Sequence, residues 1–148
     1  MASFIGIDLG TTYSAISYID DTGRPKIINN SDGENITASC IAFEGATVSF
    51  TGDIARKMYG IEDNIAARFK RDMGTSKKYT INGKKYSPTS LSAEILKRLY
   101  FDAKNQIGEI NEAVITVPAN FAQEAREETK KAAKIAGINV NYMVDEPT

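Results

Sequence analysis

The chain has 148 residues, of which 42% are hydrophobic and 25% are charged, an ordinary composition for a globular protein. This length suits one domain with a core of its own, and it is too short for a complete two-lobed kinase. The 18 basic and 19 acidic residues leave a formal net charge of −1. This balance indicates neither nucleic acid nor an anionic membrane as a partner.

The numbers of cysteines and histidines exclude some kinds of bond and of catalytic or metal site. Cys40 is the only cysteine, so no disulfide can form within the chain, as expected in the cytoplasm. The sequence holds no histidine, which excludes His-dependent triads and His-ligated metal sites within it. It shows neither a signal-peptide pattern nor an apolar run near the ~20 residues of a membrane span. We therefore expect a cytoplasmic protein without a membrane partner.

Three strands are predicted in the first part of the chain. Runs of apolar and β-branched residues place them at 4–9, 13–19 and 25–28. The connection between the first two, Gly10-Thr11-Thr12, holds no large side chain. Because the connections are short, we expect residues 4–28 to form an antiparallel meander.

The middle of the chain predicts smaller elements after a polar loop at 29–37. They are expected, in chain order, as strands at 41–43 and 48–50, a helix at 52–59 and short basic helical pieces at 64–74. Asn82 and Gly83 predict the type I′ turn of a hairpin, because both residues tolerate positive φ angles. The hairpin strands are expected at 78–81 and 84–86.

The clearest helical periodicity lies at 88–107. Ser87 can cap this helix, Pro88 suits its first position and Gly108 ends it. Apolar residues recur on one face at helical spacing, at Leu91, Ile95, Leu96, Leu99, Ala103 and Ile107.

The last part of the chain predicts a strand-helix-strand unit. Its strands are expected at 113–117 and 140–144, and its helix at 122–136 has a face of small residues that can approach a sheet closely. Such strands should be parallel members of one sheet with a right-handed crossover. The complete element order therefore predicts the α/β class, with a mixed sheet flanked by helices.

The same order predicts how the chain is divided. A core subdomain is expected at 1–29 and 88–148, with a smaller subdomain inserted at 30–87. The sequence stops directly after its last predicted strand. We therefore interpret 1–148 as the truncated first lobe of a larger domain.

The turn after the first strand is the strongest candidate for a binding site. Asp8 ends that strand, and Gly10, Thr11 and Thr12 follow. Glycine lets backbone N–H groups approach phosphate oxygens closely, and the threonine hydroxyls add donors. A carboxylate beside phosphates attracts Mg²⁺ through the waters that the ion keeps. From this string alone, a hairpin turn with capping threonines is an equal alternative.

Four other candidate residues are ambiguous by themselves. Lys70 lies between two arginines, and it could either stabilise charge on a γ-phosphate or belong to a solvated basic face. By themselves, Pro118 and Arg126 indicate only the start of a helix, and Glu146 is an acid near the end of the chain.

Five segments together resemble the DnaK-type family of 70-kDa heat-shock chaperones. They share the family's order and spacing and span nearly the whole chain, at 6–14, 69–74, 113–121, 136–140 and 146–148. Sugar kinases and actin-like proteins share the opening string but not this set. The resemblance implies the first lobe of an actin-like ATPase (RNase H-like) fold, with ATP or ADP and Mg²⁺ as ligands.

The resemblance also implies roles for residues near the nucleotide. Gly10, Thr11, Thr12 and Tyr13 match the family's phosphate-contacting loop, and Asp8 matches its magnesium-linked aspartate, which acts through water.

Catalytic and relay residues are implied in the same way. Lys70 matches the lysine that touches phosphate and orients the attacking water, and Glu146 matches an acid near that water. Pro118 and Arg126 match a proline and an arginine that relay the nucleotide state to a peptide-binding domain.

Three positions depart from the family's pattern. Asn120 replaces the usual tyrosine, Asp145 replaces the usual asparagine, and Ala38 replaces a common proline. These departures indicate a divergent paralogue and bear on whether its interdomain relay works.

The function implied for the whole protein is ATP hydrolysis that drives the binding of unfolded polypeptide clients, with co-chaperones, to assist folding. The sequence shows no second phosphate segment and no adenosine pocket, so we expect the 148-residue chain to be ineffective as an ATPase by itself. Two alternatives remain: a sugar or acetate kinase of the same superfold, and a non-catalytic binding lobe. Lys70 and the string at 117–121 argue against the kinase.

Overall fold

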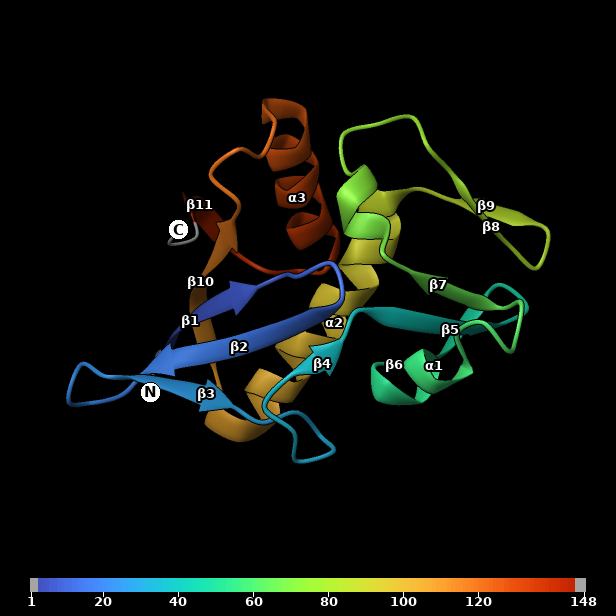
Figure 1. Cartoon of the computed structure of the whole chain (residues 1–148). Helices are drawn as coiled ribbons and strands as arrows, with labels where there is room; N and C mark the ends of the chain where they lie inside the picture. Colours follow the sequence, from blue (N-terminus) through green and yellow to red (C-terminus); the bar gives the residue numbers. More distant parts are fainter. Residues whose placement is uncertain (1–2, 146–148) are drawn as a thin grey trace.

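A computed structural model describes residues 3–145 and has the α/β architecture expected from the element order (Figure 1). Its larger sheet has the strand order β11-β10-β1-β2-β3, and β4 pairs with β2. The strands of this sheet are β1 (Ser3–Asp8), β2 (Tyr13–Ile19), β3 (Pro25–Ile28), β4 (Thr37–Ala38), β10 (Ile110–Val117) and β11 (Val140–Asp145). Antiparallel pairing of β2 with both β1 and β3 confirms the meander.

The parallel part of the larger sheet is centred on β10. This strand pairs in parallel with β1 on one side and with β11 on the other. Helix α3 (Gln123–Ile135) connects β10 to β11, so the two strands of the strand-helix-strand unit lie side by side, as expected. β10 begins earlier than the sequence predicts, at Ile110, because its first residues pair with the start of β1.

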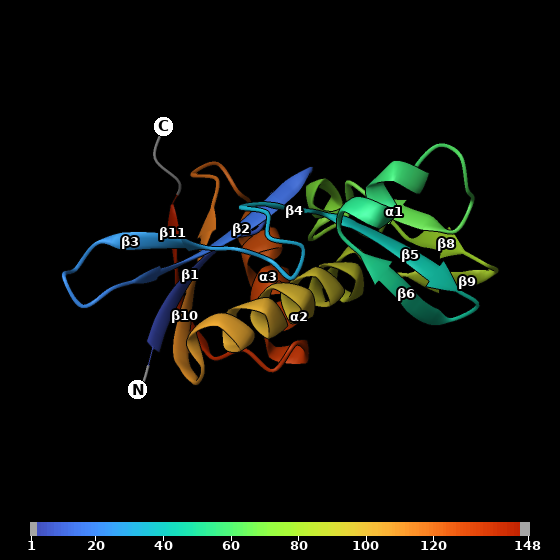
Figure 2. The same ribbon diagram turned by 90° about the horizontal axis from the view of Figure 1, so that it is seen from below.

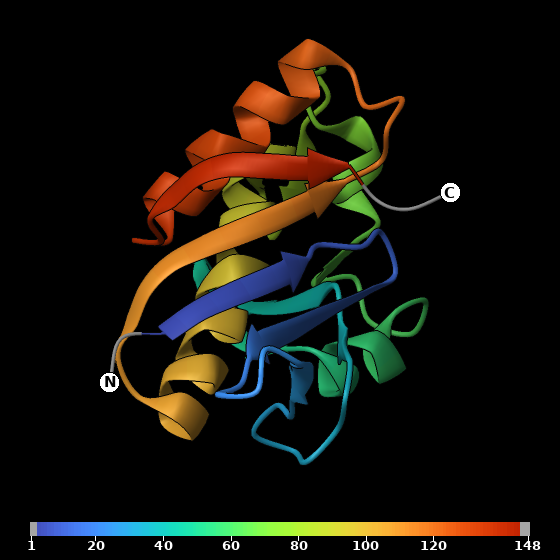
Figure 3. The same cartoon turned by 90° about the vertical axis from the view of Figure 1, so that its left-hand side faces the viewer.

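Helices α2 (Pro88–Ile107) and α3 cover one face of the larger sheet (Figure 3). Side chains along β1 alternate accordingly, since Ile5 and Ile7 are fully buried, whereas Phe4 and Asp8 on the other face are exposed. Burial of each large apolar side chain on the helix side stabilises the fold by roughly 1.5–3 kcal/mol. Within the residues that the structure describes, no helix covers the opposite face.

Helix α2 has the bounds predicted from its periodicity and its caps. Ser87 Oγ accepts a hydrogen bond from Ser90 N at 3.1 Å, Pro88 takes the first helical position and Gly108 follows the last turn. The helix contacts β2 and β3 of the larger sheet and also β5 and β6 of the smaller one. It therefore provides the common core of both sheets. Among residues 3–145, no helix is long and apolar enough to cross a membrane.

The remaining strands form two small sheets beside α2 (Figure 2). These sheets consist of β6-β5-β7 and of the hairpin β8-β9. Their strands are β5 (Cys40–Glu44), β6 (Thr47–Thr51), β7 (Ile65–Ala67), β8 (Tyr79–Ile81) and β9 (Lys84–Tyr86). Ile41 and Phe43 of β5 belong to the main core, whereas Cys40 and Ala42 pack with helix α1 (Asp53–Met58) in a second cluster.

Two expectations for the middle of the chain are wrong. Residues 65–67 form strand β7 rather than a helical piece, because their three side chains are buried and the segment pairs with β5. The helical part is one 3-10 helix, η1 (Phe69–Asp72). The second wrong expectation is the loop at 29–37, because it ends in strand β4, in which Thr37 pairs with Ser14 of β2.

The predicted turn of the β8-β9 hairpin is confirmed, with φ angles of 53° at Asn82 and 82° at Gly83.

Candidate functional site

The loop between β1 and β2 is held in a tight turn by the segment at β4. Gly10 N donates to Ser14 Oγ at 3.2 Å, and the buried Ser39 donates through Oγ to Gly10 O at 2.9 Å. Ser39 N also donates to Thr12 O at 2.9 Å. A Cβ added at Gly10 would lie 2.0 Å from Tyr13 O. Glycine is therefore required for this closed form of the loop.

The closed loop presents Thr11, Thr12 and Tyr13 to a cavity of about 310 Å³. The other lining residues come from β5, from the end of α1 and from the end of β7: Cys40, Arg56, Tyr59, Ala67 and Arg68. Hydroxyl and guanidinium groups donate hydrogen bonds to phosphate and carboxylate oxygens. None of these lining residues carries a carboxylate, so the wall of the cavity is positively charged.

Asp8 lies at the end of β1, on the face that the helices leave uncovered. Thr116 Oγ1 donates to Asp8 Oδ1 at 3.5 Å and to Ile7 O at 3.4 Å. Asp8 and Thr116 line a separate cavity of about 220 Å³. Over residues 3–145, no cluster of three or more Asp, Glu, Cys or His side chains could enclose a metal ion. A single exposed carboxylate instead fits Mg²⁺ that keeps its waters and binds phosphate oxygens.

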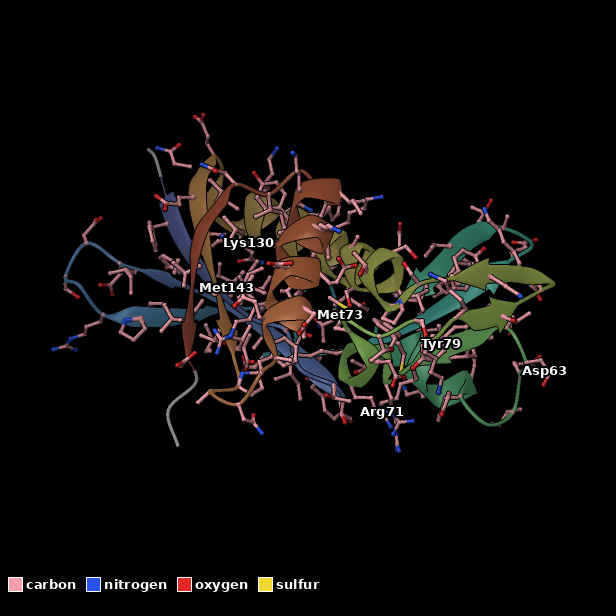
Figure 4. The ribbon with its side chains drawn as sticks, turned by 90° about the horizontal axis from the view of Figure 1, so that it is seen from above. Asp63, Arg71, Met73, Tyr79, Lys130 and Met143 are labelled. Carbon is pink, nitrogen blue, oxygen red and sulfur yellow. The ribbon has the colours of Figure 1, made fainter. Side chains whose placement is uncertain are left out.

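Lys70 is buried at the start of η1, with 6% of its surface exposed. Its Nζ lies 5.6 Å from the ring centroid of Phe121, a distance suited to a cation–π contact. The alternative of a solvated basic face is therefore wrong for Lys70, although the neighbouring Arg68 and Arg71 are exposed. Figure 4 shows Arg71 directed away from the protein and Met73 between the helices and the small sheets.

Segment η1 is fixed to its surroundings by Asp72 and Gly74. The Tyr79 hydroxyl donates to the Asp72 carboxylate. Burial and this hydrogen bond raise the pKa of Tyr79 to about 12. Gly74, at φ 83°, lies so close to α3 that an added Cβ would be 2.8 Å from Ala125 N. Lys70 is thus carried by a segment packed on one side against β8 and on the other against α3.

Arg126 joins several parts of the loop that connects β10 to α3. Its guanidinium donates to Phe121 O at 3.2 Å, to Pro118 O at 3.4 Å and to Ala119 O at 3.3 Å. It also donates to Asp145 Oδ1 at 2.9 Å. Pro118 and Arg126 therefore form a connected unit rather than a plain helix entry.

The structure brings some of the sequence candidates together and leaves others apart. Thr11, Thr12 and Tyr13 share one cavity, whereas Asp8 lines another. Lys70 lines neither of these two cavities, and Glu146 lies outside the described residues.

Sequence reasoning missed four of the residues at the larger cavity. Cys40, Arg56, Tyr59 and Arg68 come from separate elements, and no motif spacing relates them. The run of positive charge near Lys70 was the one available signal, and it concerned Arg68 alone.

Comparison with protein families shows which family the chain belongs to. A family model described as Hsp70 protein matches residues 4–82 and 75–148. The chain belongs to the Hsp70 family. Its mixed α/β architecture is that of the actin-like ATPase fold of Hsp70 proteins. Membership supports a chaperone ATPase domain of a family that binds nucleotide and Mg²⁺ and acts on client polypeptides with co-chaperones. It disfavours a small-molecule kinase.

Proposed function

We propose that this chain is the first lobe of the nucleotide-binding domain of a DnaK-type chaperone, and that it contacts the phosphates of ATP. The observation that carries the proposal is the closed loop at Gly10, which follows Asp8 in the sequence. This loop holds Thr11 and Thr12, with their backbone amides, at the edge of a cavity. Preorganised donors of this kind stabilise phosphate charge without rearranging. The proposed division is a core at 1–29 and 88–148 with an inserted subdomain at 30–87.

Each proposed site residue has a distinct chemical role. Thr11 and Thr12 donate to phosphate oxygens and fix the position of the chain of phosphates. Lys70 places an ammonium near the γ-phosphate, where it stabilises negative charge that grows during transfer to water. Asp8 accepts hydrogen bonds from the metal's waters. Glu146 lies outside the described residues and is proposed to act near the attacking water.

Mg²⁺, when bound, neutralises phosphate charge and holds the phosphates in a fixed geometry. Burial of Lys70 matters to this proposal, because a partly desolvated ammonium interacts more strongly with phosphate than a solvated one. Pro118 and Arg126 are proposed to pass the nucleotide state to a peptide-binding domain, with clients and co-chaperones as partners. We propose a cytoplasmic location for the whole protein.

The test of the catalytic part is single-turnover ATP hydrolysis by the full-length protein. Lys70→Ala should slow hydrolysis by about 100-fold or more and spare most of the nucleotide affinity. The reason is that the ammonium stabilises the negative charge of the transition state more than it stabilises the bound ground state. Lys78→Ala, which removes an exposed lysine from the same region, is the matched control and should hydrolyse normally. Near-normal hydrolysis by Lys70→Ala would remove this lysine from the mechanism.

The 148-residue chain should fold alone and yet hydrolyse ATP poorly. It encloses its own core, but phosphoryl transfer depends on charges positioned around the whole phosphate chain. Calorimetric titration with ATP and Mg²⁺ should show weak binding, reduced by Thr11→Ala. Hydrolysis by this chain at the rate of a complete ATPase domain would contradict the proposal. A complete absence of nucleotide binding in the full-length protein would favour a non-catalytic lobe.

A further inference from the structure

We propose that the β8–β9 hairpin and the segment before it form a docking surface for an acidic, extended segment of a partner polypeptide. This basic surface consists of five exposed residues, which are Arg71, Lys77, Lys78, Lys84 and Lys85. It is separate from the proposed nucleotide site, because Lys70 is buried and none of the five residues lines the cavity at Thr11 or the cavity at Asp8.

Positive charge is concentrated in this part of the sequence. Residues 68–86 hold seven of the 18 basic residues of the chain and one of its 19 acidic residues, Asp72. The rest of the chain therefore carries an excess of acid, although the formal net charge of the whole is −1. A local excess of this kind creates a positive potential that attracts and orients an acidic partner.

The two lysines of β9 have no carboxylate partner within the protein. Lys77 Nζ, in the segment before β8, lies 3.7 Å from Asp72 Oδ2. By contrast, Lys84 and Lys85 make no ion pair with any carboxylate of residues 3–145. Both lysines are exposed, so their charges can interact with a partner molecule.

The hairpin holds these lysines in a fixed arrangement. Its tip is tied to the β5–β6 turn, because Asn82 Nδ2 donates to Gly45 O at 3.0 Å. Ile81 is buried, and the Lys84 ammonium lies 5.5 Å from the ring centroid of Tyr86. Less conformational entropy is lost when a partner binds charges that are already held in place.

The other side chains of the hairpin disfavour a nucleic acid or a membrane as the ligand. Single-stranded nucleic acid binds by stacking its bases on exposed aromatic rings. Tyr79 and Tyr86 pair across the hairpin, and their rings pack against Phe69 and Phe43 of the core. No large apolar side chain of residues 77–86 is exposed, so the hairpin has no group to insert into a membrane.

The free edge of β9 favours an extended polypeptide. Strand β9 pairs with β8, and no other strand of the described residues pairs with it. An extended segment can add to such an edge through its backbone, while its side chains provide specificity. Lys84 and Lys85 are successive residues and point to opposite faces of the hairpin. Two adjacent glutamates in an added strand therefore complement both charges.

The experiment is to titrate the 148-residue chain with a short synthetic peptide in which pairs of glutamates alternate with threonine and valine. The same peptide with lysine in place of glutamate is the control ligand. Calorimetry measures the affinity, and amide hydrogen exchange locates the contact. The acidic peptide should bind, slow amide exchange in β9 and bind less tightly at higher ionic strength. Equal binding of the two peptides, or no binding of the acidic one, would overturn the proposal.

Charge-reversing variants test the assignment to the hairpin. Lys84→Glu combined with Lys85→Glu should weaken binding of the acidic peptide about tenfold or more. The matched control is Lys130→Glu combined with Lys134→Glu on α3, which changes the net charge equally. Lys130 lies far from Tyr79 and the hairpin (Figure 4), so the control should change the affinity by less than about twofold. Equal losses in the two variants would mean that net charge alone decides binding, and would overturn the proposal.

A milder variant and two other ligands complete the test. Lys84→Gln combined with Lys85→Gln, which introduces no repulsion into the hairpin, should still weaken peptide binding about threefold or more. Oligothymidine and vesicles containing phosphatidylserine should bind less tightly than the acidic peptide. Tighter binding of either ligand would overturn the choice of a polypeptide partner. All of these outcomes are independent of ATP hydrolysis, so they do not depend on the function proposed for Lys70.

Discussion

Arg126 Nη2 donates to Asp145 Oδ1 at 2.9 Å, and this ion pair joins α3 to the end of β11. The same guanidinium holds three carbonyl groups of the loop after β10. Asp145 is one of the positions at which the sequence departs from the DnaK-type pattern. The pair therefore adds a charge interaction to an arginine that we propose to act in the interdomain relay.

Asp145→Asn should have a small effect on stability. The two side chains are 25% and 57% exposed, so the pair contributes less than about 1 kcal/mol to the free energy of unfolding. Arg126→Ala should cost more, about 1–3 kcal/mol, because it also leaves backbone carbonyls without donors. Urea unfolding of both variants measures the difference. A larger loss for Asp145→Asn than for Arg126→Ala would show that the ion pair dominates.

A buried carboxylate in α2 predicts a larger effect. The Asp102 side chain has no exposed surface, and it accepts from Arg98 Nε at 3.1 Å and from the Ser31 hydroxyl. Asp102→Ala should destabilise the protein by about 2–4 kcal/mol, somewhat below a fully buried pair because Arg98 is 29% exposed.

Lys97→Ala is the control for Asp102→Ala on the same helix. In the wild-type protein, the Lys97 ammonium lies 3.1 Å from Glu94 Oε1 in an exposed pair. Loss of such a pair costs less than about 0.5 kcal/mol. Thermal unfolding should therefore separate the two variants clearly. Similar melting temperatures would mean that the Asp102 contacts contribute nothing beyond those of a surface pair.

Alanine substitutions at two glycines with nearly the same φ angle distinguish the cost of backbone strain from the cost of a steric clash. Gly74 has φ 83° and Gly60 has φ 85°, but a Cβ at Gly60 meets nothing within 4 Å. Gly60→Ala should cost about 1–2 kcal/mol, from the left-handed backbone alone. Gly74→Ala should cost at least about 2 kcal/mol more, because the methyl group would press on the backbone of α3 at Ala125. Equal costs in urea unfolding would contradict the close approach.

Tyr79 makes the stability of the protein depend on pH in the alkaline range. Its pKa is raised to about 12, from about 10 in an unfolded chain. Between these values the folded protein keeps a proton that the unfolded chain has lost, so the free energy of unfolding falls as the pH rises. Tyr79→Phe should reduce this fall between about pH 10 and 12. Tyr100→Phe, which leaves the Asp72 contact intact, should not reduce it.

Local patterns in the sequence predict most elements of this fold. Helix α2 has both of its caps and its apolar spacing within one continuous segment, so its bounds follow from residues 87–108 alone. The Asn82-Gly83 turn is equally local, because its φ angles depend on those two residues. By contrast, β7 is a strand only because β5 lies beside it. Tertiary pairing of this kind overrides the local preference of a short segment.

The candidate site shows the same division between local and distant information. The sequence predicts the turn at Gly10, since a glycine and two threonines directly follow a predicted strand. Two of the hydrogen bonds that close the turn come from Ser39, a residue 29 positions from Gly10 that lies just beyond the predicted polar loop at 29–37. Arg56 reaches the same cavity from α1. Neither residue carries a sequence signal that points to the loop.

Ser39→Ala is the sharpest test of how the loop is held. The Ser39 hydroxyl is buried, donates to Gly10 O at 2.9 Å and lies 2.9 Å from Ser14 Oγ. Its removal leaves the buried hydroxyl of Ser14 and the Gly10 carbonyl with fewer partners, which should destabilise the protein by about 1–3 kcal/mol. The loop should also become more mobile, so that its amides exchange faster with solvent.

Binding should decline together with this loss of order. A loop that must be ordered by its ligand binds phosphates more weakly than one already closed. We therefore expect Ser39→Ala to weaken binding of ATP with Mg²⁺ by about tenfold, as measured by calorimetry. Ser49→Ala is the matched control, because its hydroxyl donates to Ala42 O at 3.1 Å within the small sheet, away from the loop. Its affinity for ATP should be unchanged. Unchanged binding in Ser39→Ala, despite faster amide exchange at Thr11 and Thr12, would show that phosphate contact does not depend on the closed loop.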